Sequence, residues 1–201
     1  TTQYYNPLSM INEDTNQTIY RRMQLTGKGE LNILPELTWT AQYSYMYNQN
    51  VLSEYHSTKS QIVKTNGQAK RSTYMNNKEV FETFGNYTHS FPGYHRVGAM
   101  IGYSWEQSNQ DDGFGLTVKD FYNDAVKYYN LTYANQIDGM DGVESGAEST
   151  LRMISFYGRL NYSYASRYNL QATLRRDGSS AFGKNNRWAT FPSISAAWRI
   201  G

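Results

Sequence analysis

The feature that most constrains this chain is an alternation of apolar and polar residues that recurs in runs of ten or more positions. In the run 37–47, the odd positions are apolar or aromatic and the even positions are mostly polar. Successive side chains of a strand point to opposite sides of a sheet, so the alternation predicts long strands with one apolar and one polar face. The apolar positions of the clearest runs are Leu37, Trp39, Ala41, Tyr43, Tyr45, Tyr47; Val97, Ala99, Ile101, Tyr103, Trp105; Ile154, Phe156, Gly158, Leu160, Tyr162, Tyr164; Tyr168, Leu170, Ala172, Leu174; and Trp188, Thr190, Pro192, Ile194, Ala196, Trp198, Ile200.

Two kinds of connection separate these strands. Short turns are predicted at 34–36, 91–93 and 165–167, where Pro, Gly or Ser residues interrupt the alternation. Every second connection is instead long and polar. Outer-membrane barrels combine short periplasmic turns with long extracellular loops in this way, as an up-and-down antiparallel meander. With noisier runs at 18–33 and 71–89, about seven strands are predicted. The long connections are 1–17, 57–70, 107–148 and 178–186.

Strand length and composition bear on the choice between a membrane wall and a soluble domain. Strands of soluble proteins usually have about five or six residues, whereas a tilted strand that crosses a bilayer needs about ten. The chain has 19 Tyr and 15% aromatic residues, but it contains no apolar run of about eighteen residues that could form a transmembrane helix. The length favours a transmembrane barrel. Composition alone also allows a soluble β-sandwich that binds carbohydrate.

All four tryptophans occupy apolar positions of the alternation, which we call its apolar phase; the alternate polar positions are its polar phase. Trp39 and Trp198 lie beside predicted short turns, and Trp105 and Trp188 lie beside predicted long loops. Trp188 and Trp198 are ten residues apart on one strand, which corresponds to about 25 Å of height at a tilt of about 40°. This spacing predicts two aromatic belts at the two membrane interfaces, where an indole keeps its ring in lipid and its N–H near water.

Charge and cysteine content exclude several other classes of protein. The formal net charge is +2 and no basic cluster stands out, so nucleic-acid binding is not predicted. The absence of cysteine excludes a disulfide framework and thiolate metal sites. Seven strands cannot close a barrel, and hydrocarbon does not tolerate an open sheet edge. We therefore expect the chain to be part of a larger barrel.

The last third of the chain carries a specific resemblance. It resides in the segments 154–164, 175–180, 182–188, 191–193 and 196–200, which include Arg-Arg-Asp-Gly-Ser-Ser, Phe-Gly-Lys-Asn-Asn-Arg-Trp and Phe-Pro-Ser. These segments resemble the barrel of the SusC/RagA family, the TonB-dependent outer-membrane receptors of Bacteroidetes. Ala181 departs from the pattern, where a larger residue is expected. Upstream, 27–37 and 87–102 resemble the same barrel more loosely.

The resemblance implies an all-β, antiparallel, up-and-down transmembrane barrel of about 22 strands, of which this chain supplies about seven. Residues 1–201 are then a partial barrel domain of a TonB-dependent receptor, without its plug and N-terminal domains. The resemblance further implies import of glycans or peptides across the cell outer membrane, together with a SusD-like surface lipoprotein and TonB. The residues do not choose between the two kinds of solute.

Charged residues in the polar phase are candidates for the barrel lumen. They could contact the plug or a passing solute, or they could form a charge network that stabilises the wall. The lumen-facing candidates are Arg159, Arg175, Asp177, Arg187 and Arg199.

The long connection 107–148 is the second candidate site, because carboxylates beside aromatic faces are suited to bind sugars. A surface loop that packs only against itself is the alternative. Helical spacing of Phe121, Ala125 and Tyr128 also predicts a short helix between Val118 and Tyr129. The candidates for contact with a substrate or with the lipoprotein lid are Asp111, Asp112, Phe114, Tyr122, Tyr128 and Tyr129.

No pattern of residues points to catalysis, a cofactor or a metal. His56, His89 and His95 are the only histidines, and no pair has metal-ligand spacing. The segment 138–144 is acidic and contains glycine, but it lacks the spacing of a calcium loop. No nucleophile elbow is present. The sequence predicts a non-enzymatic transport component, with an outer-membrane enzyme as the alternative.

Overall fold

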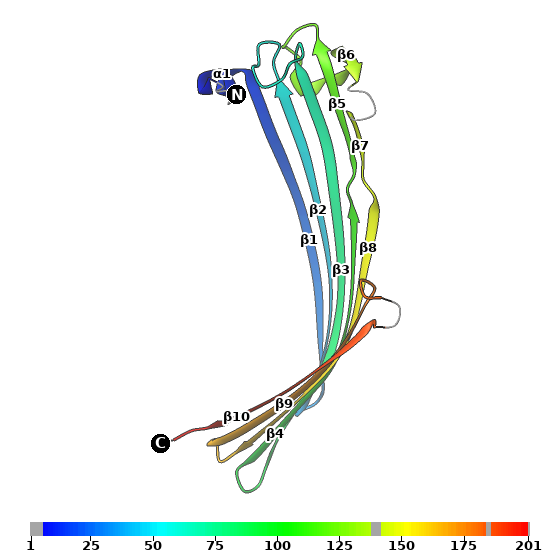
Figure 1. Cartoon of the computed structure of the whole chain (residues 1–201). Coiled ribbons are helices and arrows are strands. Elements are labelled where there is room, and N and C mark those ends of the chain that lie inside the picture. The colour runs from blue at the N-terminus through cyan, green and yellow to red at the C-terminus, as the bar shows by residue number, and fades with distance from the viewer. Residues whose placement is uncertain (1–5, 138–141, 184–185, 201) are drawn as a thin grey trace. The chain divides into compact units, whose positions relative to one another are not determined.

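A computed structural model describes residues 6–137, 142–183 and 186–200. Over these residues the chain is almost entirely β-structure (Figure 1). No described helix is long and apolar enough to cross a membrane. The elements are α1 (Pro7–Glu13), β1 (Asp14–Leu34), β2 (Leu37–His56), β3 (Gln68–Phe91), β4 (His95–Asp111), β5 (Phe114–Phe121), the 3-10 helices η1 (Lys127–Tyr129) and η2 (Leu131–Tyr133), β6 (Ala134–Ile137), β7 (Val143–Ser145), β8 (Glu148–Tyr164), β9 (Tyr168–Ser179) and β10 (Trp188–Trp198).

Seven long strands form a sheet in the order β1-β2-β3-β4-β8-β9-β10. This order confirms the predicted up-and-down meander of seven strands, since each long strand pairs with the next long strand along the chain. Two of the strands are longer than the alternation predicts, since β2 continues to His56 and β4 to Asp111. The strand β5 leaves this path and pairs with β3, β6 and β7.

The short turns lie where the sequence predicts them. The chain turns at 35–36, at 92–94 and at 165–167. At the third turn, Ala165 and Ser166 have φ of 51° and 53°, and the Arg167 N–H donates to the Tyr164 carbonyl at 3.0 Å. Two successive positive φ angles in a hydrogen-bonded turn are the geometry of a type I′ hairpin, whose twist matches that of the flanking strands.

The chain divides into two compact units. The wall unit comprises Gln24–Met46, Asn77–Asn109 and Thr150–Gly201. Its register is given by antiparallel pairs such as Leu160 with Ala172 and Ala172 with Ile194. The neighbouring row joins Asn161, Gln171 and Ser195 in the same way. One row is apolar and the next is polar, so the two phases of the sequence occupy opposite faces of the sheet.

The loop unit comprises Thr1–Met23, Tyr47–Asn76 and Gln110–Ser149. All buried hydrophobic side chains of the described residues lie in this unit, and the ring of Tyr55 packs edge-on against Phe121 with centroids 5.3 Å apart. The buried hydrophobic residues are Val51, Tyr55, Ala69, Val118, Phe121 and Tyr128.

The helix predicted between Val118 and Tyr129 is wrong. β5 runs to Phe121, and only a 3-10 turn follows at Lys127–Tyr129. β5 forms ladders with β3 on one edge and with β6 and β7 on the other. Hydrogen bonds on both edges and a β-branched Val118 outweigh a helical spacing that rests on three residues.

Candidate functional site

The polar face of the wall unit carries a connected set of charged and hydroxyl groups. The Tyr157 hydroxyl donates to Glu82 Oε1 at 2.7 Å. On the neighbouring strand, Arg175 Nε donates to both carboxylate oxygens of Asp177, at 2.8 and 3.0 Å. Arg175 Nη2 also donates to Ser155 Oγ at 3.2 Å, and Ser155 is fully buried. We call the side that bears these residues the polar face.

A glycine makes room for the tyrosine of this set. A Cβ at Gly102 would lie 2.3 Å from Cε2 of Tyr157 and 2.7 Å from its hydroxyl. Contacts that short do not occur between real side chains, so the absence of a side chain at Gly102 allows the ring to lie flat across β4 and reach Glu82. The sequence offered one signal for this arrangement, because both Glu82 and Tyr157 fall in the polar phase of their strands.

The five predicted lumen residues are not brought together as one cluster. Arg175 and Asp177 form an ion pair. Arg159 is exposed and approaches the Met100 sulfur at 3.9 Å. Arg187 and Arg199 are exposed near the two ends of β10, where their backbone groups bond to Ser179 and Arg167. Whether these side chains line a lumen stays a prediction.

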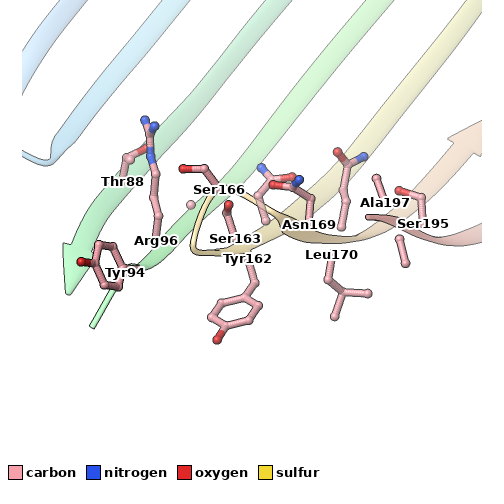
Figure 2. A pocket seen from close by; sticks show the side chains of 14 residues that line it. Thr88, Tyr94, Arg96, Tyr162, Ser163, Ser166, Asn169, Leu170, Ser195 and Ala197 are labelled. Carbon is pink, nitrogen blue, oxygen red and sulfur yellow. The ribbon is translucent and has the colours of Figure 1, made fainter. Parts of the chain in front are cut away.

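A hollow of about 590 Å³ lies on the wall unit beside the short turns at 92–94 and 165–167. Figure 2 shows its lining, where polar side chains such as Arg96, Asn169 and Ser195 project from neighbouring strands. Tyr94 stands at its rim, with φ of 66° and 81% of its surface exposed. The hollow has hydrogen-bonding groups but no pair of carboxylates.

The apolar face of the wall unit, which bears Trp39, Phe156, Trp188, Ile194 and Trp198, is organised by aromatic contacts. The Trp39 ring lies over Gly85, where a Cβ would come within 2.6 Å, and its indole N–H donates to Thr83 Oγ1 at 2.8 Å. Trp188 stacks on Phe156 at 6.2 Å and Trp198 on Tyr168 at 6.3 Å. Trp105 is partly buried. Their role as two membrane belts stays a prediction.

In the loop unit, Asp124 joins two connections that are far apart in sequence. Its Oδ1 accepts from the Tyr55 hydroxyl at 2.7 Å and from the Thr58 N–H at 2.8 Å, and its Oδ2 accepts from Thr58 Oγ1 at 2.8 Å. Burial alone would raise the pKa of Asp124, but these hydrogen bonds outweigh it and lower the pKa below its usual range. The carboxylate therefore acts as a charged pin between the connections 57–67 and 122–126.

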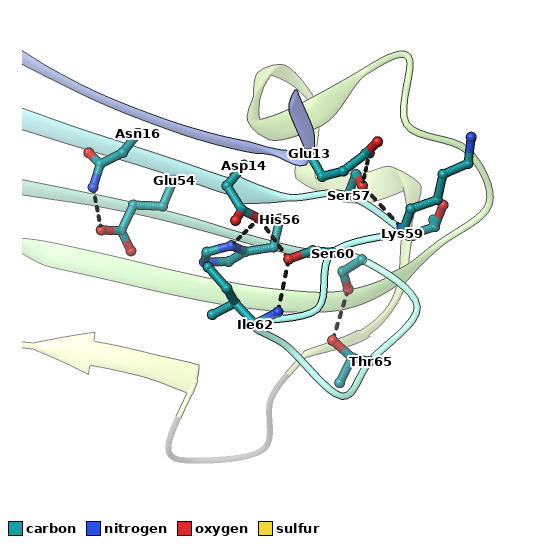
Figure 3. A network of polar contacts seen from close by, with 12 residues as sticks. Glu13, Asp14, Asn16, Glu54, His56, Ser57, Lys59, Ser60, Ile62 and Thr65 are labelled. Carbon is teal, nitrogen blue, oxygen red and sulfur yellow. Dashed lines mark hydrogen bonds and ion pairs between the residues drawn. The ribbon is translucent and has the colours of Figure 1, made fainter. Parts of the chain in front are cut away.

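A second polar network joins the start of β1 to the same connection (Figure 3). His56 Nδ1 lies 2.8 Å from Asp14 Oδ1, and Ser60 Oγ donates to the same oxygen at 2.7 Å. Ser57 Oγ donates to Glu13. Ser60, His56 and Asp14 are the residue types of a catalytic triad, but the Ser60 hydroxyl donates to the Asp14 carboxylate and not to His56. A nucleophile needs contact with its base, so the arrangement is a structural clasp.

The predicted loop candidates divide into exposed and buried residues. Tyr122 and Tyr129 are 75% and 72% exposed, and Phe114 is also exposed. Asp111 and Asp112 accept hydrogen bonds from the Gly113 N–H and from Gln110 Nε2. Tyr128 is buried in the hydrophobic core and its hydroxyl donates to Gln17 at 2.9 Å. Tyr128 therefore supports the loop unit from inside.

No group of three or more metal-ligating side chains occurs among the described residues. Part of the acidic segment 138–144, which we compared with a calcium loop, lies outside the described residues.

The two-faced sheet of long strands has a direct counterpart among known families. A family model described as the β-barrel of TonB-dependent receptor-like proteins matches residues 1–201, the whole chain. The chain belongs to this family of TonB-dependent receptor barrels. The match confirms the predicted TonB-dependent receptor barrel, and the soluble β-sandwich alternative is wrong.

The chain is similar to receptors of the SusC and RagA type. SusC of Bacteroides thetaiotaomicron is 54% identical over 48 residues, which cover 24% of this chain and 5% of SusC. A TonB-dependent receptor of Formosa agariphila is 27% identical over 202 residues, 97% of this chain and 18% of the receptor. The solved structure of the RagAB peptide transporter matches with a TM-score of 0.83 at 21% identity, over 93% of this chain and 20% of that one.

As a segment of a TonB-dependent receptor barrel, the chain belongs to the bacterial outer membrane. The chain spans only about a fifth of the length of these relatives: 18% of the Formosa agariphila receptor and 20% of the RagAB chain.

Proposed function

We propose that this barrel segment forms part of the wall of an importer that takes up glycans or peptides together with a SusD-like surface lipoprotein and TonB. The observation that carries the proposal is the two-faced wall, in which a hydrogen-bonded polar face is backed by an exposed apolar face. The names of the relatives point the same way, since SusC is a TonB-dependent receptor and RagAB is a peptide transporter.

The apolar face is proposed to contact lipid and the polar face to line the lumen. Support comes from exposure, since Leu160 and Ile194 are 60% and 75% exposed on the apolar face. Such a row is unfavourable in water but stable in hydrocarbon. On the other face, the Tyr157–Glu82 and Arg175–Asp177 contacts satisfy polar groups that a water-filled lumen or a plug domain would meet.

The loop unit is proposed to contact the lipoprotein lid or the solute. It has its own hydrophobic core and the Asp124 pin, so it does not depend on a partner for its internal order. Phe114 follows Asp111 and Asp112 at the start of β5, and the exposed Tyr122 and Tyr129 follow the other end of β5. Aromatic faces and carboxylates are both suited to contact sugars and peptides.

A paired substitution in the full-length receptor tests this role. Tyr122→Ser and Tyr129→Ser together should lower lid co-purification or solute-dependent growth, while heat-modifiable migration of the barrel stays normal. Tyr94→Ser, at the short turn 92–94, is the matched control because its ring is equally exposed. Unchanged growth and unchanged lid binding in the double variant would contradict the proposal.

A larger deletion separates function from barrel assembly. Replacing Asn109–Glu148 by a short Gly/Ser linker removes β5 and its pairing with Gln68–Ser72 of β3. The long strands do not need that pairing to form their own ladders, so the barrel should still assemble while uptake falls. Loss of the barrel itself would mean that the loop unit serves stability, not uptake.

Competition between a peptide mixture and an oligosaccharide mixture for uptake by the intact receptor identifies the class of solute.

A further inference from the structure

We propose that the polar hollow beside the short turns at 92–94 and 165–167 binds a carboxylate group of the transported solute, and that Arg96 is the residue that holds it. The carboxylate would belong to an acidic sugar or to a peptide. The inference rests on the proposed function, because it takes the polar face of the wall unit to line the lumen. It adds to that function a chemical property of the solute.

The alignment of the strands brings Arg96 beside the amide residues of the hollow. A Cβ at Gly98 would lie 3.7 Å from Cβ of Asn161, so these two residues are neighbours on β4 and β8. The two strands are antiparallel neighbours in the meander, so two residues before Gly98 on β4, Arg96 lies beside Ser163 of β8. Ser163 pairs with Asn169 of β9. At usual strand spacings the Cα of Arg96 is about 8 Å from that of Asn161 and about 10 Å from that of Asn169, within reach of a long side chain.

The side chains that line the hollow project from one side of the sheet. Figure 2 shows Arg96, Ser163 and Asn169 on one side of the ribbon, whereas Tyr162 and Leu170 project from the other side. The alternation of the strands requires this separation, since successive side chains point to opposite faces. A ligand on the polar face therefore meets the guanidinium and the amide together.

Small residues leave the space that the hollow occupies. Gly98 lies beside Asn161, which pairs with Gln171, and Gln171 pairs with Ser195. This row has a glycine at one end and a serine at the other, with the two longer amide side chains between them. The volume of about 590 Å³ falls within the range of about 300–1,000 Å³ that is usual for sites of small ligands.

The charge of the hollow is not balanced from within. Arg96 is the only charged residue in its lining. Among the described residues, the Arg96 side chain makes no ion pair and no hydrogen bond. Arg175 on the same face is instead paired with Asp177. Glu36, at the next short turn, has its carboxylate 3.6 Å from His89 and does not line the hollow. The Arg96 guanidinium is therefore available to a ligand.

A carboxylate is the ligand group that fits these side chains. The planar guanidinium of Arg96 can donate two parallel hydrogen bonds to the two carboxylate oxygens. The amides of Asn161, Asn169 and Gln171 have both N–H donors and an acceptor oxygen, which suit the hydroxyl groups of a sugar or the backbone of a peptide. A neutral solute would leave the guanidinium without a partner of opposite charge.

The test measures the binding of small probes to the full-length receptor in nanodiscs by saturation-transfer NMR. One pair of probes is N-acetyl-triglycine and its C-terminal amide, and the other is digalacturonate and its methyl ester. The wild-type receptor should bind at least one acid about tenfold more tightly than its neutral counterpart, and Arg96→Gln should abolish this preference. The pair that shows the preference identifies the source of the carboxylate.

Arg176→Gln is the matched control. Arg176 is also an exposed arginine of the wall unit, but it pairs with Phe156 in the apolar phase and so lies on the opposite face. The control should keep the preference for the acid. Heat-modifiable migration of both variants checks that the barrel is folded.

Several outcomes overturn the proposal. Equal binding of acid and neutral probes by the wild type, or no binding of any probe, would mean that the hollow does not recognise a carboxylate. A preference that survives in Arg96→Gln, or is lost equally in Arg176→Gln, would remove the assignment to Arg96. Faster hydrogen exchange in another part of the receptor in Arg96→Gln, with unchanged probe binding, would mean that the hollow holds a segment of the receptor itself.

A failure of this site is distinguishable from a failure of the proposed function. Fluorophores at Ile194 and Ser195, quenched from the bilayer, report separately which face of the wall unit meets lipid. A receptor with the proposed facing and normal uptake but no preference for the acid probes overturns the site alone.

Discussion

The proposal that the apolar face of the wall unit contacts lipid is most sharply tested by a charge placed midway between the two tryptophans of β10. Ile194 lies six residues from Trp188 and four from Trp198 on β10. At about 3.3 Å per residue and a tilt of about 40°, this puts Ile194 about 10 Å above the lower tryptophan and about 15 Å below the upper one. Its row continues through Ala172 to Leu160, so no polar partner for a new charge lies beside it.

Ile194→Arg in the full receptor should therefore cost about 2–4 kcal/mol of barrel stability, as measured for arginine near the bilayer midplane. Ser195→Arg is the matched control, because Ser195 pairs with Gln171 in the adjacent polar row, and it should cost well under half as much. The assay is urea unfolding of the receptor in lipid vesicles, followed by tryptophan fluorescence and heat-modifiable migration. Equal destabilisation by both variants, or a larger effect of Ser195→Arg, would refute the facing.

Three further outcomes are expected. Gly102→Ala puts a methyl group 2.3 Å from a tyrosine ring carbon and should destabilise the barrel by about 1–3 kcal/mol in the same urea assay; Gly98→Ala, whose nearest neighbour would be 3.7 Å away, should not. The hydrogen bonds that lower the pKa of Asp124 stabilise the loop unit above the ordinary carboxyl pKa of about 3.9, and this stabilisation is lost as the pH falls further. Hydrogen exchange in the loop unit should accelerate below about pH 4, and Asp124→Asn should remove most of that pH dependence; equal acceleration in both would contradict the pin. A protease site in 107–148 should be cleaved on intact cells and one at Pro35 should not, and the reverse pattern would invert the topology.

The strands and their two faces could be read from the sequence because both are local properties. The alternation around Leu37 and Ile154 needs no knowledge of the neighbouring strand, and the turns at 35–36 and 165–167 are signalled by their own residues. Length then separates a bilayer-crossing strand from a soluble one. The same local pattern carried the resemblance in the last third of the chain, which the family match confirms.

Contacts between side chains on different strands could not be predicted from the sequence. Tyr157 and Glu82 are 75 positions apart in sequence. Their contact depends on how β3 and β8 are each aligned with β4, the strand between them. The long connection 107–148 separates β4 from β8 in the chain. The vacancy at Gly102 that admits the tyrosine ring is likewise a property of the neighbouring strand. No pattern within either segment encodes that register.

The loop unit shows the same division most clearly. Sequence alone determined that 107–148 is long, aromatic and not of low complexity, but its helical spacing was misleading. The tertiary structure decided that Val118 and Phe121 belong to a strand, because β3, β6 and β7 satisfy the backbone of β5 on both edges. It also decided that Tyr128 is buried while Tyr122 and Tyr129 are exposed. Burial depends on which distant segments supply the partners, and those partners are set by non-local pairing and not by the local order of residues.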